Sequence, residues 1–193
     1  NVRVVAILFQ LPLTFLVAAD SPYKSIRDLK GARLPSGYVG QQTVRVTQDA
    51  LLASVGLGMK DVTSVPVVNA FQAVDALREG KVDAANIGPG TGQVQQAHVE
   101  LSSRGGVRFL SIDSTPEALA IMRKFLPMRP IVVQPAPNLP GVIGPTTVMG
   151  YSMYLVAGEK TPDDVVYRLV KMLHESKEDL VKITPVLNGF DPN

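Results

Sequence analysis

Apolar residues are distributed along this chain in short blocks, and the first block is nearly continuous. Residues 4–19 are strongly apolar and predict two buried strands, over residues 2–9 and 13–18, that meet near Pro12. A membrane-spanning helix needs about 20 such residues, and Gln10 and Pro12 interrupt this shorter run. We therefore expect two strands here rather than a membrane span or an export signal.

Beyond Ser25, strand and helix spacings alternate. We expect strands over residues 32–37, 63–68, 81–87, 107–112 and 147–158. We expect a helical turn over residues 25–31 and helices over residues 43–55, 69–80, 93–103, 115–125, 177–183 and from about 161 onward. Asn69 is the predicted cap of its helix, and Phe71, Val74 and Leu77 are its predicted inner face. The proline-rich residues 127–145 predict an irregular crossing segment.

This alternation indicates the fold class. Strands separated by helices of 10–15 residues are typical of βαβ units, so we expect an α/β fold with a mainly parallel sheet and flanking helices. The length of 193 residues allows one large domain or two small lobes, and 46% hydrophobic residues predict a sizeable core.

Charge and cysteine content exclude several classes of function. The formal net charge is +2, no run of basic residues occurs, and aromatic residues make up only 6%. Nucleic-acid binding is therefore not expected, because it requires clustered cations with stacking aromatics. The absence of cysteine excludes disulfides, thiol catalysis and cysteine metal sites. His98 and His174 lie far apart, so we expect no metal site and no cofactor.

Catalytic motifs are also missing from the sequence. It contains no G-x-S-x-G elbow, no H-E-x-x-H pair and no phosphate-binding G-x-x-x-x-G-K-[ST] loop. The acidic pairs Asp163-Asp164 and Glu178-Asp179 lie at predicted helix starts or on exposed faces, where they are typical of solvated residues. We therefore expect a protein that is not an enzyme.

Two glycine-rich strand ends carry the candidate chemistry. Residues 35–43 and 86–92 each leave a predicted strand and enter a predicted helix, whose first backbone N–H groups can hold a small anion. A flexible loop or an ordinary capped turn is the simpler alternative at each place. Tyr151 and Tyr154 lie three apart in a predicted strand, so they face opposite ways, and one of them is able to line a crevice.

The order of several motifs resembles a known family. The segments SIRDLKGARLPSGY, ALLASVGL and FQAVDALREGKVDAANIG resemble type II periplasmic binding proteins. The later segments TPDDVVYRLVKMLHESKEDL and LNGFDP are similar to the TAXI family, the solute-binding subunits of one branch of the TRAP transporters. The sequence GQQTV departs from the G-x-G-S-G-T-like loop of many members, so only the position of the loop is carried over, and not its specificity.

The resemblance implies a two-lobed protein that traps a small organic acid, glutamate-like or a dicarboxylate, outside the cytoplasm or in the periplasm and then docks on membrane subunits. It implies that residues 21–143 form the second lobe, and that residues 1–20 and 144–193 form hinge strands and part of the first. Relative to the family, we expect this chain to lack segments at both ends, the export signal among them. The expected ligand-binding residues are Ser36, Gly37, Tyr38, Gln41, Gln42, Pro89, Gly90 and Thr91, with Tyr151 from a hinge strand.

Three alternatives remain open at this point. One is the binding subunit of an ATP-driven importer for sulfonates or nitrate-like anions, which shares the lobe pattern. Another is a small-molecule-sensing effector domain, which a DNA-binding helix pair would precede. The third is a transferase-like enzyme, which would need an acid and a base in its cleft, and the sequence offers no such pair.

Overall fold

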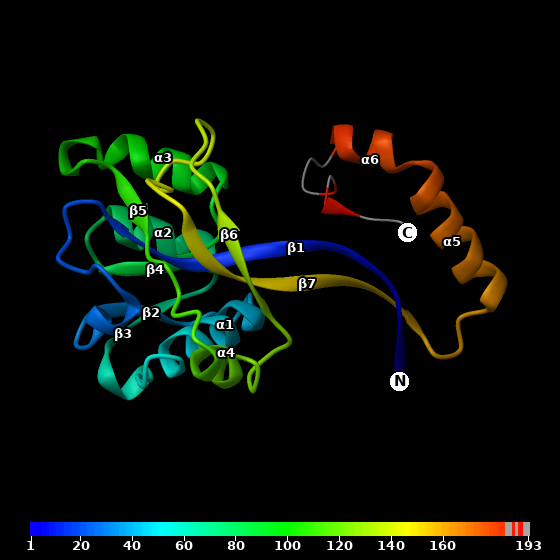
Figure 1. The fold of residues 1–193 in the computed structure, drawn as a ribbon, viewed down its shortest axis with the longest axis horizontal. Helices are drawn as coiled ribbons and strands as arrows, with labels where there is room; N and C mark the ends of the chain where they lie inside the picture. The colour runs from blue at the N-terminus through cyan, green and yellow to red at the C-terminus, as the bar shows by residue number, and fades with distance from the viewer. Residues whose placement is uncertain (184–186, 188, 191–193) are drawn as a thin grey trace. The chain divides into compact units, whose positions relative to one another are not determined.

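The computed structural model describes residues 1–183, 187, 189 and 190 (Figure 1). It divides into two compact units, which we describe separately. The larger unit is Pro12–Gly150, and the smaller one combines Asn1–Leu11 with Tyr151–Asn193. The long strands β1 (Val2–Ala18) and β7 (Thr146–Gly158) run through both units. Within the described part of the chain, no helix has both the length and the apolar character needed to cross a membrane.

The main sheet is antiparallel, so the prediction of a mainly parallel sheet is wrong. Its strand order is β4-β1-β7-β6, and β5 pairs with β1 as well. The strands β4 (Ala84–Ile87) and β5 (Val107–Phe109) both run antiparallel to β1, and β6 (Arg129–Val133) runs antiparallel to β7. The reason is that Leu16 and Val17 of β1 pair with both β4 and β5 and separate them. Sequence spacing alone does not reveal such an inserted strand.

A second, parallel pair of strands completes the larger unit. β2 (Arg33–Gly37) and β3 (Thr63–Val67) run in the same direction, with Gly37 opposite Val67. The helices are α1 (Gln42–Ala53), α2 (Ala70–Arg78), α3 (Gly92–Glu100) and α4 (Pro116–Met122). Single 3₁₀ turns cover Ile26–Leu29, Met59–Asp61 and Ser102–Arg104. The predicted cap at Asn69 is confirmed, because Gln72 N–H donates to Asn69 Oδ1 (2.9 Å).

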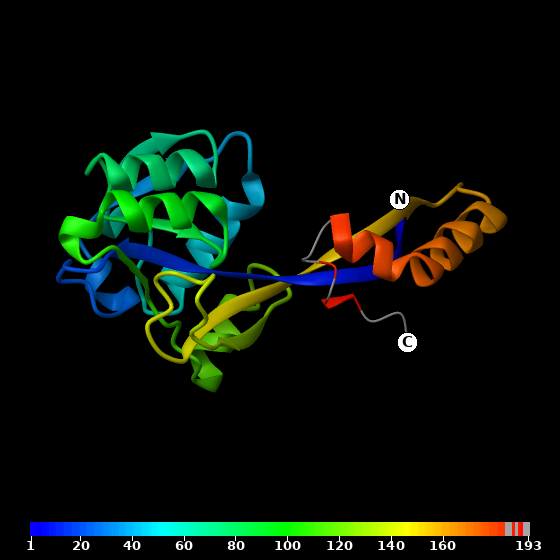
Figure 2. The same cartoon turned by 90° about the horizontal axis from the view of Figure 1, so that it is seen from above.

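Two apolar clusters form the core, one on each face of β1. Side chains of a strand alternate between its faces, and Leu16 joins one cluster while Phe15 and Val17 join the other. The first cluster receives α2 and α3, which lie side by side, and the second receives α4 and part of α1 (Figure 2). This burial on both faces explains why residues 13–18 are apolar except for Thr14, whose hydroxyl donates to the Leu110 carbonyl (2.8 Å).

Three local predictions are wrong. β1 is one continuous strand of 17 residues rather than two strands. Its ladder with β4 begins only at Thr14, so Pro12 breaks no bond of that ladder. The crossing segment contains the regular strand β6, and Phe71 is 45% exposed, because α2 packs through Ala70, Ala73, Val74, Ala76 and Leu77 instead.

The smaller unit holds α5 (Asp163–Glu175) and α6 (Lys177–Ile183), and the predicted helices are confirmed here. Arg3 fixes the start of α5, because its guanidinium pairs with Asp163 (2.8 Å) and donates to the Thr161 carbonyl (2.6 Å). Neither helix contains a fully buried residue. The motif LNGFDP lies partly outside the described residues. The assignment of residues 21–143 to a second lobe, and of the remainder to hinge and first lobe, stays a prediction.

Candidate ligand-binding site

Three strand ends of the larger unit meet at one edge. β2 and β3 are parallel, so the connections that follow them start side by side. The end of β4 joins them through Asn86, whose Nδ2 donates to the Val44 carbonyl (3.2 Å) and to Thr47 Oγ1 (3.0 Å) in the first half of α1. We call residues 38–41, 68–69 and 88–91 the strand-end edge. The structure thus connects the end of β4, which precedes one glycine-rich turn, to the first half of α1, which follows the other. Ligand crevices of open α/β sheets lie at such strand ends.

Gln41 connects two of these turns. The Ala70 N–H group, at the start of α2, donates to Gln41 Oε1 (2.8 Å), and Gly40 N–H donates to the Val68 carbonyl (3.0 Å). This bond occupies the oxygen of the amide and fixes which end of the amide is the NH₂ group. Gln41 Nε2 has no hydrogen-bond partner among the described residues and the side chain is half-buried. Gln41 therefore presents an oriented donor at the strand-end edge.

Gln42 is engaged at both ends of its amide. Its Nε2 donates to the Tyr38 carbonyl (3.2 Å), and Arg45 Nε donates to its Oε1 (3.0 Å). The Gln42 side chain therefore stabilises the first turn of α1, and both ends of its amide already have partners. In the described structure no side chain caps α1, whereas Thr91 Oγ1 accepts from Val94 N–H (3.4 Å) at α3. The start of α1 therefore keeps its partial positive charge accessible.

Tyr38 lies in the core, although it belongs to the predicted set. Its ring is fully buried, its hydroxyl donates to Gln48 Oε1 (3.0 Å), and burial raises the pKa of the phenol. Gln48 Nε2 in turn donates to the Pro35 carbonyl (2.7 Å). The backbone of Tyr38 has a φ of 48°, in the left-handed region, and this turns the chain from β2 toward α1. Only its backbone reaches the strand-end edge.

Residues 36–38 also line a small pocket on the α1 side of β2. Arg45, Gln48, Asp49 and Met59 complete it, and its volume is about 90 Å³. A cavity of about 150 Å³ is known to hold benzene, so this pocket is small for an organic ligand. Burial raises the pKa of Asp49 here, while the nearby Arg45 acts in the opposite direction.

The β4–α3 turn has little room for side chains. A Cβ at Gly88 would lie 2.5 Å from the Pro12 carbonyl oxygen, and one at Gly90, whose φ is +84°, would lie 3.0 Å from Leu139 Cδ2. The backbone of Pro89 and Thr91 is therefore held against its neighbours. Tyr151 belongs to the smaller unit, where burial raises its pKa. Its place beside the strand-end edge stays a prediction.

Sequence reasoning missed a group of apolar side chains at this edge. Val39 is 74% exposed, Val68 is 46% exposed and Phe71 is 45% exposed. Val39 and Val68 lie in the connecting turns, and Phe71 is the second residue of α2. We call these three residues the apolar rim. The available signal was the position of Val39 and Val68 next to polar turn residues, outside any strand or helix.

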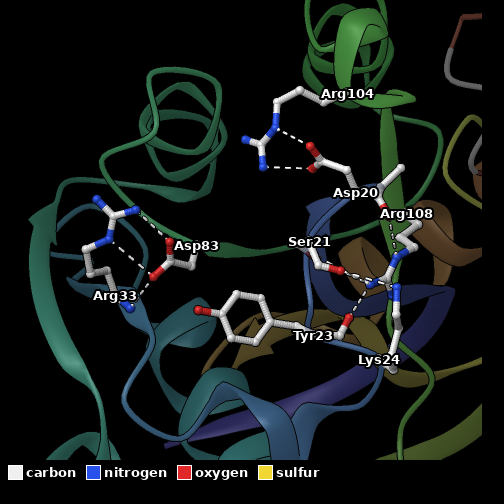
Figure 3. Close-up of polar contacts among 9 residues, drawn as sticks. Asp20, Ser21, Tyr23, Lys24, Arg33, Asp83, Arg104 and Arg108 are labelled. Atoms are coloured by element: carbon white, nitrogen blue, oxygen red, sulfur yellow. Dashed lines mark hydrogen bonds and ion pairs between the residues drawn. The ribbon is translucent and has the colours of Figure 1, made fainter.

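The opposite edge of the sheet holds a denser polar cluster (Figure 3). Arg108 donates to the carbonyls of Ala19 (3.1 Å), Ser21 (3.1 Å) and Tyr23. The pair Arg33–Asp83 (2.6 Å) and the pair Arg104–Asp20 (2.8 Å) lie on the same side. Arg104 and Arg108 thus bind the connection after β1 to the start of β5, and Arg33 binds the start of β2 to the start of β4. Their satisfied hydrogen bonds indicate a structural role for this edge.

Metal chemistry receives no support from residues 1–183. In the described part of the chain, no three histidine, cysteine, aspartate or glutamate side chains are grouped so that they could hold an ion. In each ion pair of the opposite edge one arginine binds one carboxylate, so these carboxylates already have partners and form no set of metal ligands.

Comparison with solved structures identifies the fold. A periplasmic transporter structure matches with 17% identity and a TM-score of 0.59, over 100% of this chain and 60% of the other. A periplasmic sulfonate-binding protein from Methylobacillus flagellatus KT matches with 21% identity and a TM-score of 0.52, over 100% and 53%. A protein from R. palustris, solved with adipate, matches with 16% identity and a TM-score of 0.52, over 100% and 60%.

These similarities establish the α/β fold of periplasmic binding proteins, and this chain spans somewhat more than half the length of each matched structure. A family model also matches nearly the whole sequence, over residues 1–192. The chain belongs to the NMT1-like family, a family of solute-binding-protein-like domains.

Proposed function

We propose that this chain is the ligand-binding part of an extracytoplasmic solute-binding subunit that captures a small organic acid at the strand-end edge. The observation that carries the proposal is the Gln41 amide, whose NH₂ group is left without a partner among the described residues. It lies directly before the uncapped start of α1. In a chain with the fold of periplasmic binding proteins, such an unused donor is expected to face a ligand.

The chemistry of the edge favours an anionic head group. An NH₂ group only donates hydrogen bonds, and the first amides of a helix also donate and carry a partial positive charge. A carboxylate or a sulfonate, which only accepts, complements both groups. Gln41 and the backbone of residues 42–43 would hold this head group. Ser36, Gly37, Pro89, Gly90 and Thr91 would form the remainder of the wall, with Tyr151 contributed from a hinge strand.

The proposed mechanism is capture by closure. A ligand that contacts both lobes of such a protein binds the closed form more tightly and so shifts the equilibrium toward it. The closed form would then dock on membrane subunits. Similarity of the segment at residues 161–180 to TAXI proteins supports a TRAP-type transporter, which an ion gradient drives. In that case no nucleotide site is needed.

A second candidate is the binding subunit of an ATP-driven importer. One structurally similar protein is a sulfonate-binding component of an ABC transporter, and another was solved with adipate. Sulfonates and adipate both carry head groups that only accept hydrogen bonds, so the donors of the strand-end edge can bind either kind. The identity of the bound acid separates the two candidates, because a ligand set restricted to sulfonates or inorganic anions favours the importer. A sensing effector domain would instead bind a regulatory metabolite without any transporter.

A thermal-shift screen of the full-length protein tests the proposal, because the proposed closure requires both lobes. The panel contains glutamate, 2-oxoglutarate, C4-dicarboxylates, simple monocarboxylates and sulfonates. A ligand at 100 times its dissociation constant stabilises a protein by about 2.7 kcal/mol, which gives a clear shift of the melting temperature. We expect at least one organic acid to stabilise the chain. If no member of the panel does so, the proposed function is wrong.

Gln41→Ala and Gln42→Ala form a matched pair for this screen. Loss of a hydrogen bond to a charged group costs about 1.5–3 kcal/mol, so Gln41→Ala should weaken binding by about tenfold or more. Gln42→Ala removes an amide whose ends are already occupied, and binding should change by less than about threefold. Equal effects of the two substitutions would contradict the assignment of Gln41 to the head group.

A further inference from the structure

The strand-end edge contains no charged residue in any of its three connections. The nearest cation along the chain is Arg45, on the second turn of α1. Its Nε already donates to Gln42 Oε1 (3.0 Å), and its guanidinium lies 3.9 Å from the Asp49 carboxylate. An ammonium group of a ligand would therefore find no carboxylate in these connections. A second carboxylate would likewise find no guanidinium or ammonium group there.

The apolar rim lies beside the Gln41 amide. A Cβ at Gly40 would lie 3.3 Å from Val68 Cγ1, so the glycine allows Val68 to pack against the β2–α1 turn next to Val39. Ala70, which donates to Gln41, directly precedes Phe71. Val39 and Val68 thus come from the two turns that Gln41 joins, and Phe71 lies in the first turn of the helix that follows.

Exposed apolar side chains are common when they occur singly, but a cluster beside a donor is a different feature. Burial of apolar surface stabilises by about 25 cal/mol per Å². The rim residues expose much of their apolar surface, so a ligand that covers them would gain this free energy. Val99 on α3 is also exposed (69%), but it lies near the end of that helix rather than at its start on the strand-end edge. It therefore serves as an internal control for exposure alone.

We infer that the ligand has an apolar body beside a single anionic head group, and that Val39, Val68 and Phe71 contact this body. The inference rests on the proposed function, because the head group is the one that Gln41 holds. Under this inference, an amino acid or a dicarboxylate binds these residues more weakly than an acid with one charged group does. Their second charged group would lie against the neutral and apolar residues of the strand-end edge, because Arg45 and Asp49, beside Ser36 and Gly37, already have partners.

Three ligands of matched length test the inference on the purified chain. Hexanoate carries one carboxylate, adipate adds a second one, and 6-aminohexanoate adds an ammonium group at the same end. We expect isothermal titration calorimetry to show that hexanoate binds at least about tenfold more tightly than either of the others, since desolvating an unpaired charge is unfavourable. Tighter binding of adipate or 6-aminohexanoate would overturn the inference while the proposed function stands.

Variants connect this preference to the rim. Phe71→Ala and Val68→Ser should each weaken hexanoate binding by about fivefold to tenfold, because both remove apolar contact area. Both residues are substantially exposed, so the fold is expected to tolerate the changes. Val99→Ala should leave hexanoate binding unchanged. If the rim variants bind hexanoate as the parent does, the contact assignment is wrong. If no acid of either panel binds, both proposals are wrong.

Discussion

The two edges of the sheet in the larger unit are built in opposite ways. At the strand-end edge the connections are neutral and rich in glycine, and one amide keeps its NH₂ group without a partner in the described structure. At the opposite edge, Arg33, Arg104 and Arg108 reach carboxylates or backbone carbonyls, and Arg108 alone satisfies three carbonyls (Figure 3). Both edges are formed by strands of the same two sheets, β2–β3 and the main sheet, and both are supported by the same apolar clusters.

This difference shows which edge is structural and which is available for recognition. A polar group whose hydrogen bonds are complete has little to gain from a ligand, because binding would first break those bonds. A donor without a partner in the protein exchanges only its bonds with water when it binds a ligand, so no bond within the fold is lost. Density of charge is therefore a poor guide to the binding edge in this protein. If this is so, changes at the opposite edge lower stability, and changes at the strand-end edge lower affinity.

The largest effect on stability is expected from Arg108→Met. The side chain is 8% exposed, and its loss leaves the carbonyls of residues 19, 21 and 23 without their donor. An unsatisfied buried polar group costs about 1–3 kcal/mol, so we expect the free energy of unfolding to fall by about 2–4 kcal/mol in urea titrations. Arg123→Met, which removes one long bond to Met128, is the control. A loss below about 1 kcal/mol for Arg108→Met would show that the opposite edge is not structural.

A smaller loss is expected from Gly88→Ala, on the strand-end edge. The new Cβ would lie 2.5 Å from the Pro12 carbonyl oxygen, and the backbone must shift to relieve the overlap. Overpacking of this kind costs about 1–3 kcal/mol, measurable as a lower melting temperature. Gly92→Ala is the matched control, because nothing lies within 4 Å of its added Cβ and alanine favours the helix. Equal melting temperatures for the two variants would show that the β4–α3 turn has room for a side chain at residue 88.

The sequence predicted the helices well because their signals are local. The cap at Asn69, the start at Thr115-Pro116 and the periodic face of α5 all depend on residues within a few positions of each other. Sheet order was not predictable in this way. The insertion of β1 between β4 and β5 depends on pairing between residues about 70 and 90 positions apart, and hydrophobic spacing carries no record of it.

The candidate site shows the same limit at the level of single residues. Glycine and glutamine before a helix indicated where a ligand could approach, and the structure joins the turn after β2 to the start of α2 through Gln41. The sequence could not show that the adjacent residues Gln41 and Gln42 differ, because one amide bonds α2 across the edge and the other bonds its own helix. Tyr38 was equally ambiguous, since a left-handed backbone directs its ring into the core.

Acid should weaken the opposite edge, by less than the two substitutions above. Burial on its own would raise the pKa of Asp83, but hydrogen bonds from the Arg33 side chain and backbone lower it below its ordinary value. The Arg104 side chain likewise lowers the pKa of Asp20. A carboxyl group with a depressed folded-state pKa stabilises the fold above its unfolded pKa of about 3.9, and this contribution is lost as the pH falls through the folded value.

Urea titrations at pH 6, 4 and 3 check this dependence. We expect the free energy of unfolding to fall with decreasing pH, and the Asp83→Asn variant to show a shallower fall, because it no longer has that titrating group. Asp163→Asn, on the exposed pair of the smaller unit (91% exposed at the aspartate), is the control. Stability that rises on acidification would contradict the assigned direction of these pKa shifts.

The smallest effect is expected from the exposed pair of the opposite edge, Arg104–Asp20. The two side chains are 44% and 49% exposed, and such pairs contribute about 0–1 kcal/mol. Arg108 already holds the carbonyls of residues 19 and 21 on either side of Asp20, so the connection keeps its course when Arg104 is replaced by alanine. A double-mutant cycle with Asp20→Ala, measured at low and high salt, isolates the pair. We expect a coupling energy below about 1 kcal/mol that falls further at high salt, and this result would assign the stability of the edge to Arg108. A larger coupling energy that resists salt would mean that the three arginines act as one unit.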